Sequence, residues 1–434
     1  MLNRYFIAAR LILFLLAACA SGTPGQPASG SATPSLDGTI PAASATASPS
    51  EISTPSPTPE NAPDLTGEGI VIMHLCDQSG PLGPANAGRI QAVQDMVAAI
   101  NTGGGIFGAE LDLRFADTEG NADAAQRALA RLIRQRGEGP LVLICDPLTE
   151  AALLTQLNED EIPALGPGVF ANSDGFVFSL DASPQEHYEF SLEDLRANWE
   201  ARKPQGASDE MRVAVITWPE EAAGELAADQ IVTDVEEAGI EIVMQAELPA
   251  EQDANVFDLI YQARDENANV IYTNARGFGL AAVLNALHEL GLGERFVVAA
   301  PAAAFDAQVY GYLAEPSFAA GLYLTSAWAW WGEQDVAGIQ DLLEIQEAGS
   351  GRDWGYIQMA GGVAVARRAL EDAILAEGFE GLSPEAVAAA MEELEDYPVS
   401  GGLFVVDYTS GLGAVGPLRV WQVGVGEWEL TAIE

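Results

Sequence analysis

Apolar runs and segments of helical periodicity alternate along most of the chain. An apolar run at 69–76 is bounded by turn residues, and a segment with helical spacing follows at 87–100. The alternation continues with strands expected at 110–116, 141–145 and 163–166 and helices expected at 122–136 and 151–158. It predicts an α/β fold, in which helices cover both faces of a parallel sheet and ligands lie beyond the carboxyl ends of the strands.

The same alternation starts again after Pro204. Strands are expected at 212–217, 240–245, 270–273 and 296–299, and helices at 222–238, 256–267 and 280–290. A tryptophan-rich stretch at 326–331 comes next, before helices at 337–346, 357–377 and 384–395 and strands at 403–407 and 418–425. We therefore predict two α/β lobes, each built on a parallel sheet flanked by helices.

The first residues have the pattern of an export signal. Arg4 and Arg10 precede an apolar run at 11–18, which is too short to span a bilayer. Ser, Thr, Pro, Gly and Ala then dominate to about residue 64, and such a segment cannot bury enough apolar surface to offset its ordering entropy. We expect a signal peptide at 1–18 and a disordered tether at 19–65. No later stretch approaches 18 uninterrupted apolar residues, so no other span is expected.

The signal segment ends in Leu16-Ala17-Ala18-Cys19, which resembles the lipobox of bacterial lipoproteins. In that motif the cysteine receives a diacylglycerol and becomes the mature N-terminus, so the resemblance implies lipidation of Cys19. The alternative is an ordinary signal peptide that is cut near Ala20.

Composition excludes several partners and activities. Nineteen Lys and Arg face 64 Asp and Glu, a net charge of −45, which opposes binding to nucleic acid or to anionic lipid headgroups. We expect no metal site or cofactor, because the histidines and cysteines lack ligand spacing; they are His74, His187, His288, Cys19, Cys76 and Cys145.

Enzyme motifs are also missing from the sequence. There is no Gly-x-Ser-x-Gly, no Walker loop and no closely spaced pair of histidines. The glycines at 103–105 follow a predicted helix rather than a strand, so they make a poor phosphate cradle. We therefore expect a binding protein rather than an enzyme.

Several motifs, taken in order, resemble the type I extracytoplasmic solute-binding proteins of ABC importers, in the branched-chain amino acid and amide group. Ser79-Gly80-Pro81 resembles that family's opening, and residues 99–108 resemble its Asn-x-x-Gly-Gly-Ile-x-Gly segment. Asp117 with the Ala-rich segment 123–132 is similar to the next unit, and 402–407 and 420–428 resemble the carboxyl end. The resemblance covers residues 68–434.

The resemblance implies two lobes that are joined by three crossings and hinge closed over a ligand. Lobe one would comprise 66–183 and 301–413, and lobe two 184–300 and 414–434. The implied protein is a monomer tethered to the outer face of the cell membrane, which delivers a small polar solute to the permease and ATPase subunits of an ABC importer. The alternative is a ligand-sensing receptor lipoprotein of the same fold that signals to a membrane sensor.

Candidate ligand contacts are the residues that follow strand ends, and each of them could instead be an ordinary loop or packing residue. They are Asp77, Gln78, Ser79, Asp146, Thr149, Gly168, Val169, Phe170, Trp218, Thr273, Asn274, Arg276 and Ala302.

Departures from the family pattern indicate the kind of solute. Where the amino acid binders use a serine for the substrate carboxylate, this chain offers Thr149, and Ala302 aligns with the family's acid for the substrate ammonium. A solute that is larger and less zwitterionic than leucine or valine is therefore expected. Asp77, Asp146 or Glu150 would meet a cation or sugar hydroxyl groups, and Arg276 would meet an anion.

Two features leave alternatives open. Trp328, Trp330 and Trp331 could form an aromatic wall for a ligand or belong to the core. Cys76 and Cys145 end neighbouring strands of the predicted sheet, so they could form a disulfide or remain two packed thiols.

Overall fold

The computed structural model describes residues 62–136, 141–167, 175–218, 239–249, 255–346, 352–409 and 414–433. The predicted signal peptide, Cys19, most of the tether and the predicted helix 222–238 lie outside these ranges. Within them, no helix is both long enough and apolar enough to cross a membrane.

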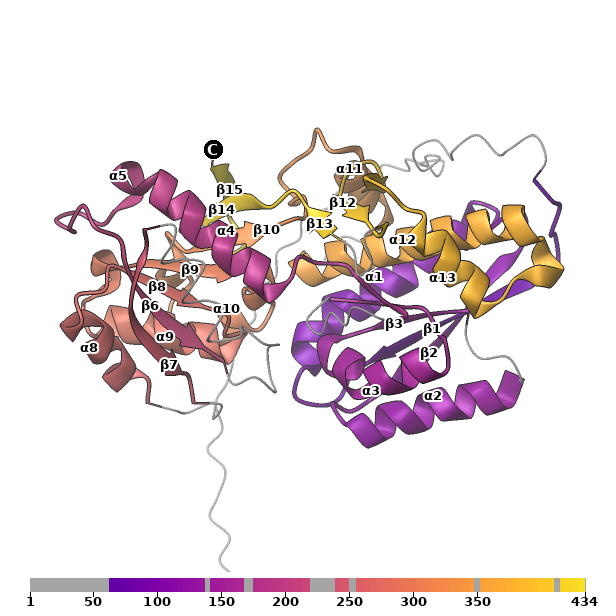
Figure 1. The fold of residues 1–434 in the computed structure, drawn as a ribbon, viewed down its shortest axis with the longest axis horizontal. Coiled ribbons are helices and arrows are strands. Elements are labelled where there is room, and N and C mark those ends of the chain that lie inside the picture. Colours follow the sequence, from indigo (N-terminus) through magenta and orange to yellow (C-terminus); the bar gives the residue numbers. More distant parts are fainter. Residues whose placement is uncertain are drawn as a thin grey trace, which may run out of the picture. The chain divides into compact units, whose positions relative to one another are not determined.

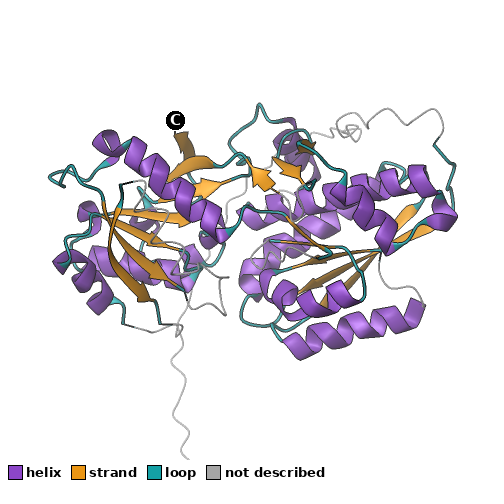
Figure 2. Cartoon of the chain, in the orientation of Figure 1, coloured by secondary structure: helices purple, strands orange, loops and turns teal. Residues whose placement is uncertain are grey.

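The first sheet has five parallel strands in the order β2-β1-β3-β4-β5 (Figures 1 and 2). These strands are β1 (Gly69–Cys76), β2 (Glu110–Asp117), β3 (Val142–Cys145), β4 (Ala164–Gly166) and β5 (Val177–Ser179). The helices that connect them are α1 (Gly83–Thr102), α2 (Ala122–Arg136) and α3 (Pro147–Glu159). Side chains alternate between the two faces of the sheet, so Ile70 and Ile72 join one core cluster and Met73 and Leu75 another.

The second sheet has seven strands in the order β15-β14-β10-β9-β8-β6-β7. These strands are β6 (Arg212–Thr217), β7 (Glu241–Glu247), β8 (Val270–Thr273), β9 (Val297–Pro301), β10 (Tyr323–Ser326), β14 (Arg419–Val423) and β15 (Leu430–Ile433). β14 and β15 pair antiparallel, and the other five are parallel. The associated helices are α4 (Pro184–Ala197), α5 (Trp199–Arg202), α8 (Phe257–Asp265), α9 (Phe278–Glu289) and α10 (Val309–Tyr312).

The remaining elements pack on the first sheet's side of the fold, where α12 lies against α1 and α13. They are α11 (Ala337–Ile345), α12 (Trp354–Glu377), α13 (Pro384–Glu392) and a small antiparallel sheet of β11 (Tyr397–Val399), β12 (Phe404–Asp407) and β13 (Ala414–Gly416). Gly361 and Gly362 of α12 let Phe404 and Leu180 approach the helix backbone, because a Cβ at either glycine would collide with them.

Strand pairing changes one part of the predicted lobe division. β10 pairs with both β9 and β14, so residues up to Ser326 continue the second sheet, although the prediction placed 301–413 in lobe one. The stretch 301–326 lacks a long apolar run, which is why its strand was missed. The other predicted lobe boundaries stay predictions.

Of the two alternatives left open for Cys76 and Cys145, the structure has the two packed thiols and no disulfide. Cys76 and Cys145 are both free and buried. Leu75, not Cys76, pairs with Cys145 across β1 and β3. Because successive side chains point to opposite faces of a sheet, the two thiols lie on opposite faces and cannot meet.

The tryptophans of the stretch 326–331 belong to the core rather than to a ligand wall. Trp328, Trp330 and Trp331 are 1%, 3% and 6% exposed. The rings of Trp328 and Trp330 pack against Trp354, with centroids 6.1 and 4.4 Å away.

Candidate functional site

The carboxylates at the strand ends of the first sheet hold its loops together. Asp77 accepts hydrogen bonds from the backbone N–H of Gly80 at 2.6 Å and of Leu82 at 2.8 Å. Asp146 accepts from the Asp77 backbone and, as the N-cap of α3, from Thr149 N–H at 2.9 Å. Burial raises the pKa of Asp77, although these donors oppose the shift. Asp77 and Asp146, which were predicted to contact the ligand, therefore already accept hydrogen bonds from the protein backbone.

Their neighbours differ in exposure. Gln78 and Ser79 are exposed, and their backbone N–H groups donate to Asp117 at 3.0 and 3.3 Å. Thr149 is buried, with its hydroxyl 3.3 Å from that of Thr118. Of these three predicted contacts, Gln78 and Ser79 present their side chains to solvent.

At the second sheet, the predicted contacts form a tight corner between β6 and β8. The Asn274 side chain accepts from Trp218 N–H at 2.7 Å, and Thr273 accepts from Ala275 N–H at 3.1 Å. The Trp218 ring lies edge-on to Phe278, with centroids 4.9 Å apart, and is 9% exposed. Trp218 thus packs against the start of α9.

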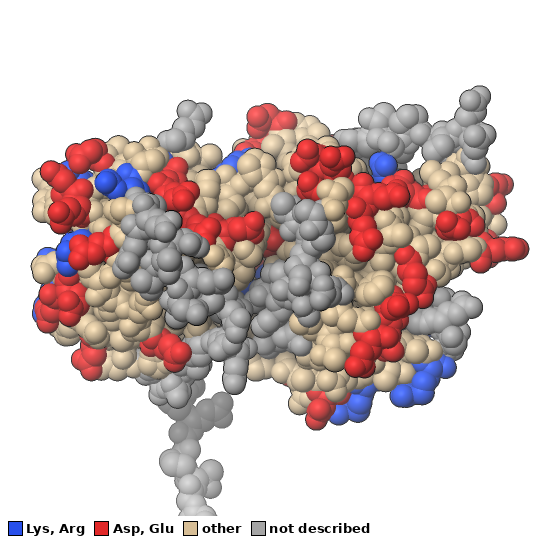
Figure 3. Space-filling model, viewed as in Figure 1, with Lys and Arg blue, Asp and Glu red and all other residues tan. Residues whose placement is uncertain are grey.

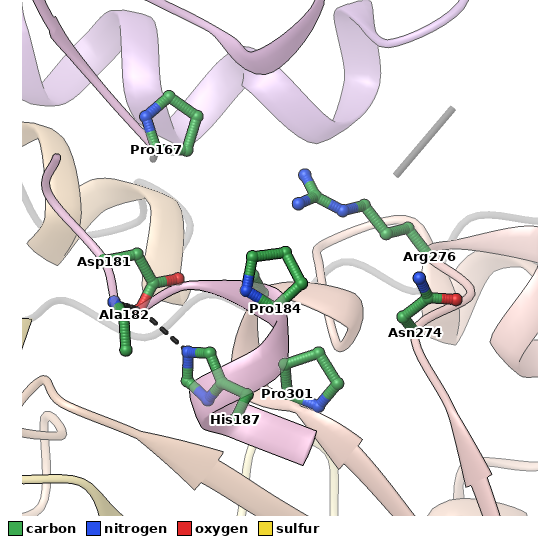
Figure 4. A pocket seen from close by; sticks show the side chains of 9 residues that line it. Pro167, Asp181, Ala182, Pro184, His187, Asn274, Arg276 and Pro301 are labelled. Carbon is green, nitrogen blue, oxygen red and sulfur yellow. Dashed lines mark hydrogen bonds and ion pairs between the residues drawn. The ribbon is translucent and has the colours of Figure 1, made fainter. Parts of the chain in front are cut away.

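A pocket lies where loops from both sheets meet the chain segment that runs from β5 into α4 (Figure 4). It is lined by Pro167, Asp181, Ala182, Pro184, His187, Asn274, Arg276, Pro301 and Ala303. Five of these nine residues are prolines and alanines, so much of the wall is apolar. The side chain of Arg276 extends from the loop after β8 toward the side where Asp181 lies (Figure 4).

A buried hydrogen-bond network supports one wall of the pocket. His187 Nε2 lies 3.0 Å from Asp181 Oδ1, and its Nδ1 lies 3.0 Å from the hydroxyl of Thr325 in β10. Asp181 also accepts from Ala182 N–H, and Ser191 donates to the His187 carbonyl while lying 3.2 Å from Thr325. The network therefore ties the segment after β5 to a strand of the second sheet.

The same segment is joined to two other parts of the chain. Trp328, which follows β10, donates its indole N–H to the Leu180 carbonyl at 2.8 Å. Tyr408, which follows β12, donates to the Ser179 carbonyl at 2.6 Å. Three chain segments that pass between the sheets thus meet beside the pocket.

Charged groups from separate elements gather near Arg276. Burial raises the pKa of Asp306, in the loop after β9, to about 6, while the positive charges of Arg89 and Arg276 oppose that shift. Asp353, the N-cap of α12, is 3% exposed, and burial raises its pKa against the opposing charge of Arg89. Two arginines and two carboxylates are therefore electrostatically coupled beside the pocket.

The structure brings two of the predicted contacts, Asn274 and Arg276, to the pocket wall. Ala302 is 1% exposed and lies between two lining residues, and Gly168, Val169 and Phe170 lie outside the described residues. The remaining predicted contacts are not among the residues that line this pocket; they are Asp77, Gln78, Ser79, Asp146, Thr149, Trp218 and Thr273.

Sequence reasoning missed Asp181 and His187, because both belong to a segment between lobes rather than to a strand-end loop. The sequence did hold a signal, since Ser183-Pro-Gln-Glu186 is a capping box with proline at the first helical position. That motif marks the start of α4 and places His187 in its first turn.

The described residues of the pocket include groups that suit ligand binding. No group of three or more His, Cys, Asp or Glu side chains there could hold a metal ion. Arg276 contributes a positively charged guanidinium group and Asn274 a side-chain amide, and both lie beside the apolar part of the wall.

Two α/β units with a pocket at their connecting segments define the class of two-lobed solute-binding proteins. The comparison with family models agrees: residues 69–426 match the model described as periplasmic binding protein, and the chain belongs to that family. The predicted type I fold is thereby confirmed. No functionally curated protein matches the chain.

Solved structures with the same fold share little sequence with this chain. A branched-chain amino acid ABC transporter protein from Thermus thermophilus with bound valine is 15% identical, with a TM-score of 0.70 over 85% of this chain and 96% of that one. A fatty acid ABC transporter substrate-binding protein from Thermomonospora curvata is 15% identical, with a TM-score of 0.70 over 86% and 93%. A solute-binding protein from R. palustris in complex with benzoate is 15% identical, with a TM-score of 0.66 over 84% and 95%.

Proposed function

We propose that this protein is the membrane-tethered solute receptor of an ABC importer and that it captures a small organic anion with an apolar body. The observation that carries the proposal is the pocket itself, which combines residues from the strand-end loops of both sheets with the segment that connects them. A ligand bound there contacts both lobes, so its binding energy favours the closed arrangement.

The lining residues indicate the solute's chemistry. Arg276 carries a planar guanidinium of the kind that a carboxylate accepts hydrogen bonds from, and Asn274 carries a side-chain amide whose Oδ1 accepts from Trp218 N–H. The prolines and alanines of the wall suit an apolar body. Valine and benzoate, the ligands of two structural neighbours, both combine a carboxylate with apolar carbon.

Delivery to a permease requires that the body stay near the membrane. We propose that Cys19 carries the lipid anchor and that the segment up to about residue 64 is the tether. A random coil of about 45 residues has a root-mean-square reach on the order of 35–40 Å, which keeps the body close to its transporter.

A thermal-shift screen of matched compounds tests the proposed solute class. The set pairs each aliphatic or aromatic carboxylate with its uncharged amide or alcohol and adds zwitterionic amino acids, polyamines and sugars. A ligand that binds only the folded state stabilises it by about 2.7 kcal/mol at 100 times its dissociation constant. Carboxylates should raise the unfolding temperature and their uncharged partners should not; a response confined to polyamines or sugars would refute the anion assignment.

A further inference from the structure

Three arginines form a row along the outer side of α2. Arg127, Arg131 and Arg134 follow one another at i, i+4 and i+7, and all three are exposed. The buried side of the same helix carries Leu129 and Leu132, which lie about half a helical turn away. The arginines therefore face away from the sheet, and Figure 3 shows Lys and Arg atoms gathered at the place that α2 occupies in Figure 1.

This row concentrates positive charge on one helix of a chain whose net charge is −45. Within the described part of the chain, Arg127, Arg131 and Arg134 form no ion pair. Elsewhere, ion pairs with Asp or Glu occupy Arg114, Arg202, Lys203, Arg212, Arg264, Arg367, Arg368 and Arg419. The acids nearest in sequence to the row are Asp123, four residues before Arg127, and Glu138, four residues after Arg134.

The row runs toward the end of the first sheet at which the described chain begins. The strands of this sheet are parallel, so α2 starts near their carboxyl ends and returns to their amino ends before β3. β1 begins at that same edge, at Gly69, directly after the segment proposed as the tether. The arginines thus lie on a side of the body that the tether can bring to the membrane, and they lead away from the strand ends that form the pocket.

We propose that the α2 arginine row docks the tethered body on anionic phospholipid headgroups. Guanidinium groups bind phosphate oxygens through paired hydrogen bonds, and a helical row spans about 10 Å, enough to engage neighbouring headgroups. The acids on the rest of the surface do not prevent this, since charges more than a Debye length of about 8 Å from the membrane are largely screened. The proposal rests on the membrane tether of the proposed function, which turns a weak contact into an intramolecular one.

Vesicle binding tests the row directly. Full-length protein carrying Cys19→Ala, so that no lipid anchor contributes, is sedimented with vesicles of 30% phosphatidylglycerol in phosphatidylcholine or of phosphatidylcholine alone. The triple variant Arg127→Gln/Arg131→Gln/Arg134→Gln is compared with a control of equal charge, Arg114→Gln/Arg212→Gln/Arg264→Gln, which removes ion-paired arginines. Any contribution from the N-terminal segment is the same in both.

We expect the row variant to lose at least tenfold in binding to the anionic vesicles at low salt, and the control less than twofold. Equal binding of the two variants would overturn the proposal. Row-dependent binding to native membranes but not to protein-free vesicles would also overturn it, in favour of an acidic protein partner. Solute-induced thermal shifts of the row variant separate this result from the proposed function, because the row lies outside the pocket and they should be unchanged.

Discussion

At the scale of single residues, the pocket and its surroundings use charge in two ways. The carboxylates of Asp77 and Asp146 are satisfied by backbone N–H groups and shape the loops of the first sheet. Arg276 and Asp306 lie instead in a coupled group of charges beside the pocket, where a change of one charge alters the others. Residue types and strand ends made Asp77 and Arg276 equally good candidates in the sequence, and only hydrogen-bond geometry separates their roles.

Replacement of Arg276 tests its proposed contact with an anionic solute. With a carboxylate ligand identified by the thermal-shift screen, Arg276→Ala should weaken binding by more than tenfold, since it removes a charged hydrogen-bond partner from the pocket. Arg276→Lys should recover part of the loss, because it restores charge without the guanidinium fork. The control is Arg264→Ala, which removes a partly exposed arginine paired with Asp265. Calorimetric titration measures all three; a loss smaller than tenfold for Arg276→Ala would make this residue a structural one.

The pKa of Asp306, raised to about 6 by burial, predicts a pH dependence of stability. Because this value exceeds the ordinary value of 3.8, the folded state takes up a proton at a higher pH than the unfolded state does. The contribution of Asp306 to stability therefore rises as pH falls through 6 and levels off below about 4. Relative to Asp306→Asn, the wild type should gain about 1 kcal/mol between pH 7 and pH 5.

Denaturant unfolding at pH 5, 6, 7 and 8 measures this difference for the two proteins. Titrating groups far from Asp306 contribute equally to both and cancel, whereas Asp353, which is coupled to Asp306, responds to the substitution as part of the same effect. A difference in unfolding free energy that stays constant across this range would show that Asp306 titrates near its ordinary pKa.

At the scale of elements, the helices and strands that could be predicted from the sequence are the ones whose core-facing side chains are apolar. The bounds of β1, β6, β8 and α2 agree with the predicted ranges, because each presents a clear apolar run or stripe. Helix α4 was missed because its buried side includes His187 and Ser191, so its apolar spacing is incomplete. β5 and β10 were also missed; β10 ends in Thr325 and Ser326, so its apolar run is only two residues long.

The start of α4 offers a test at this scale. Ser183 accepts a hydrogen bond from Glu186 N–H at 3.2 Å, and the Glu186 carboxylate accepts one from Ser183 N–H at 2.7 Å. Ser183→Ala removes the first bond and should cost about 1 kcal/mol of unfolding free energy. Ser383, which caps α13 by the side-chain bond to Ala386 N–H, provides a matched Ser→Ala comparison at a second cap. Denaturant unfolding compares the variants, and an unchanged midpoint for Ser183→Ala would show that the bond to the Ser183 hydroxyl contributes nothing to stability.

At the scale of the whole molecule, alternation of strands and helices was enough to predict two sheets but not the pocket. Its lining comes from segments as far apart as Pro167 and Ala303, and the residues at its centre belong to the chain that passes between the sheets. Such a segment has no periodic pattern of its own. Its position is fixed by long-range contacts, such as those of Trp328 and Tyr408 with the carbonyls of Leu180 and Ser179, which no local pattern records.

The lipid anchor proposed at Cys19 would place this molecule at the membrane, and its loss is the corresponding prediction. One acyl chain holds a protein only marginally on a bilayer, whereas a diacylglycerol supplies two chains and gives stable anchoring. Cys19→Ala should therefore move the protein from the membrane fraction to the medium or periplasm, while a soluble-phase assay should find solute binding unchanged. Cys76→Ala is the control, because it removes a buried free thiol from the folded body and should leave the protein on the membrane. Fractionation and immunoblotting measure both variants, and retention of Cys19→Ala on the membrane would rule out the lipid anchor.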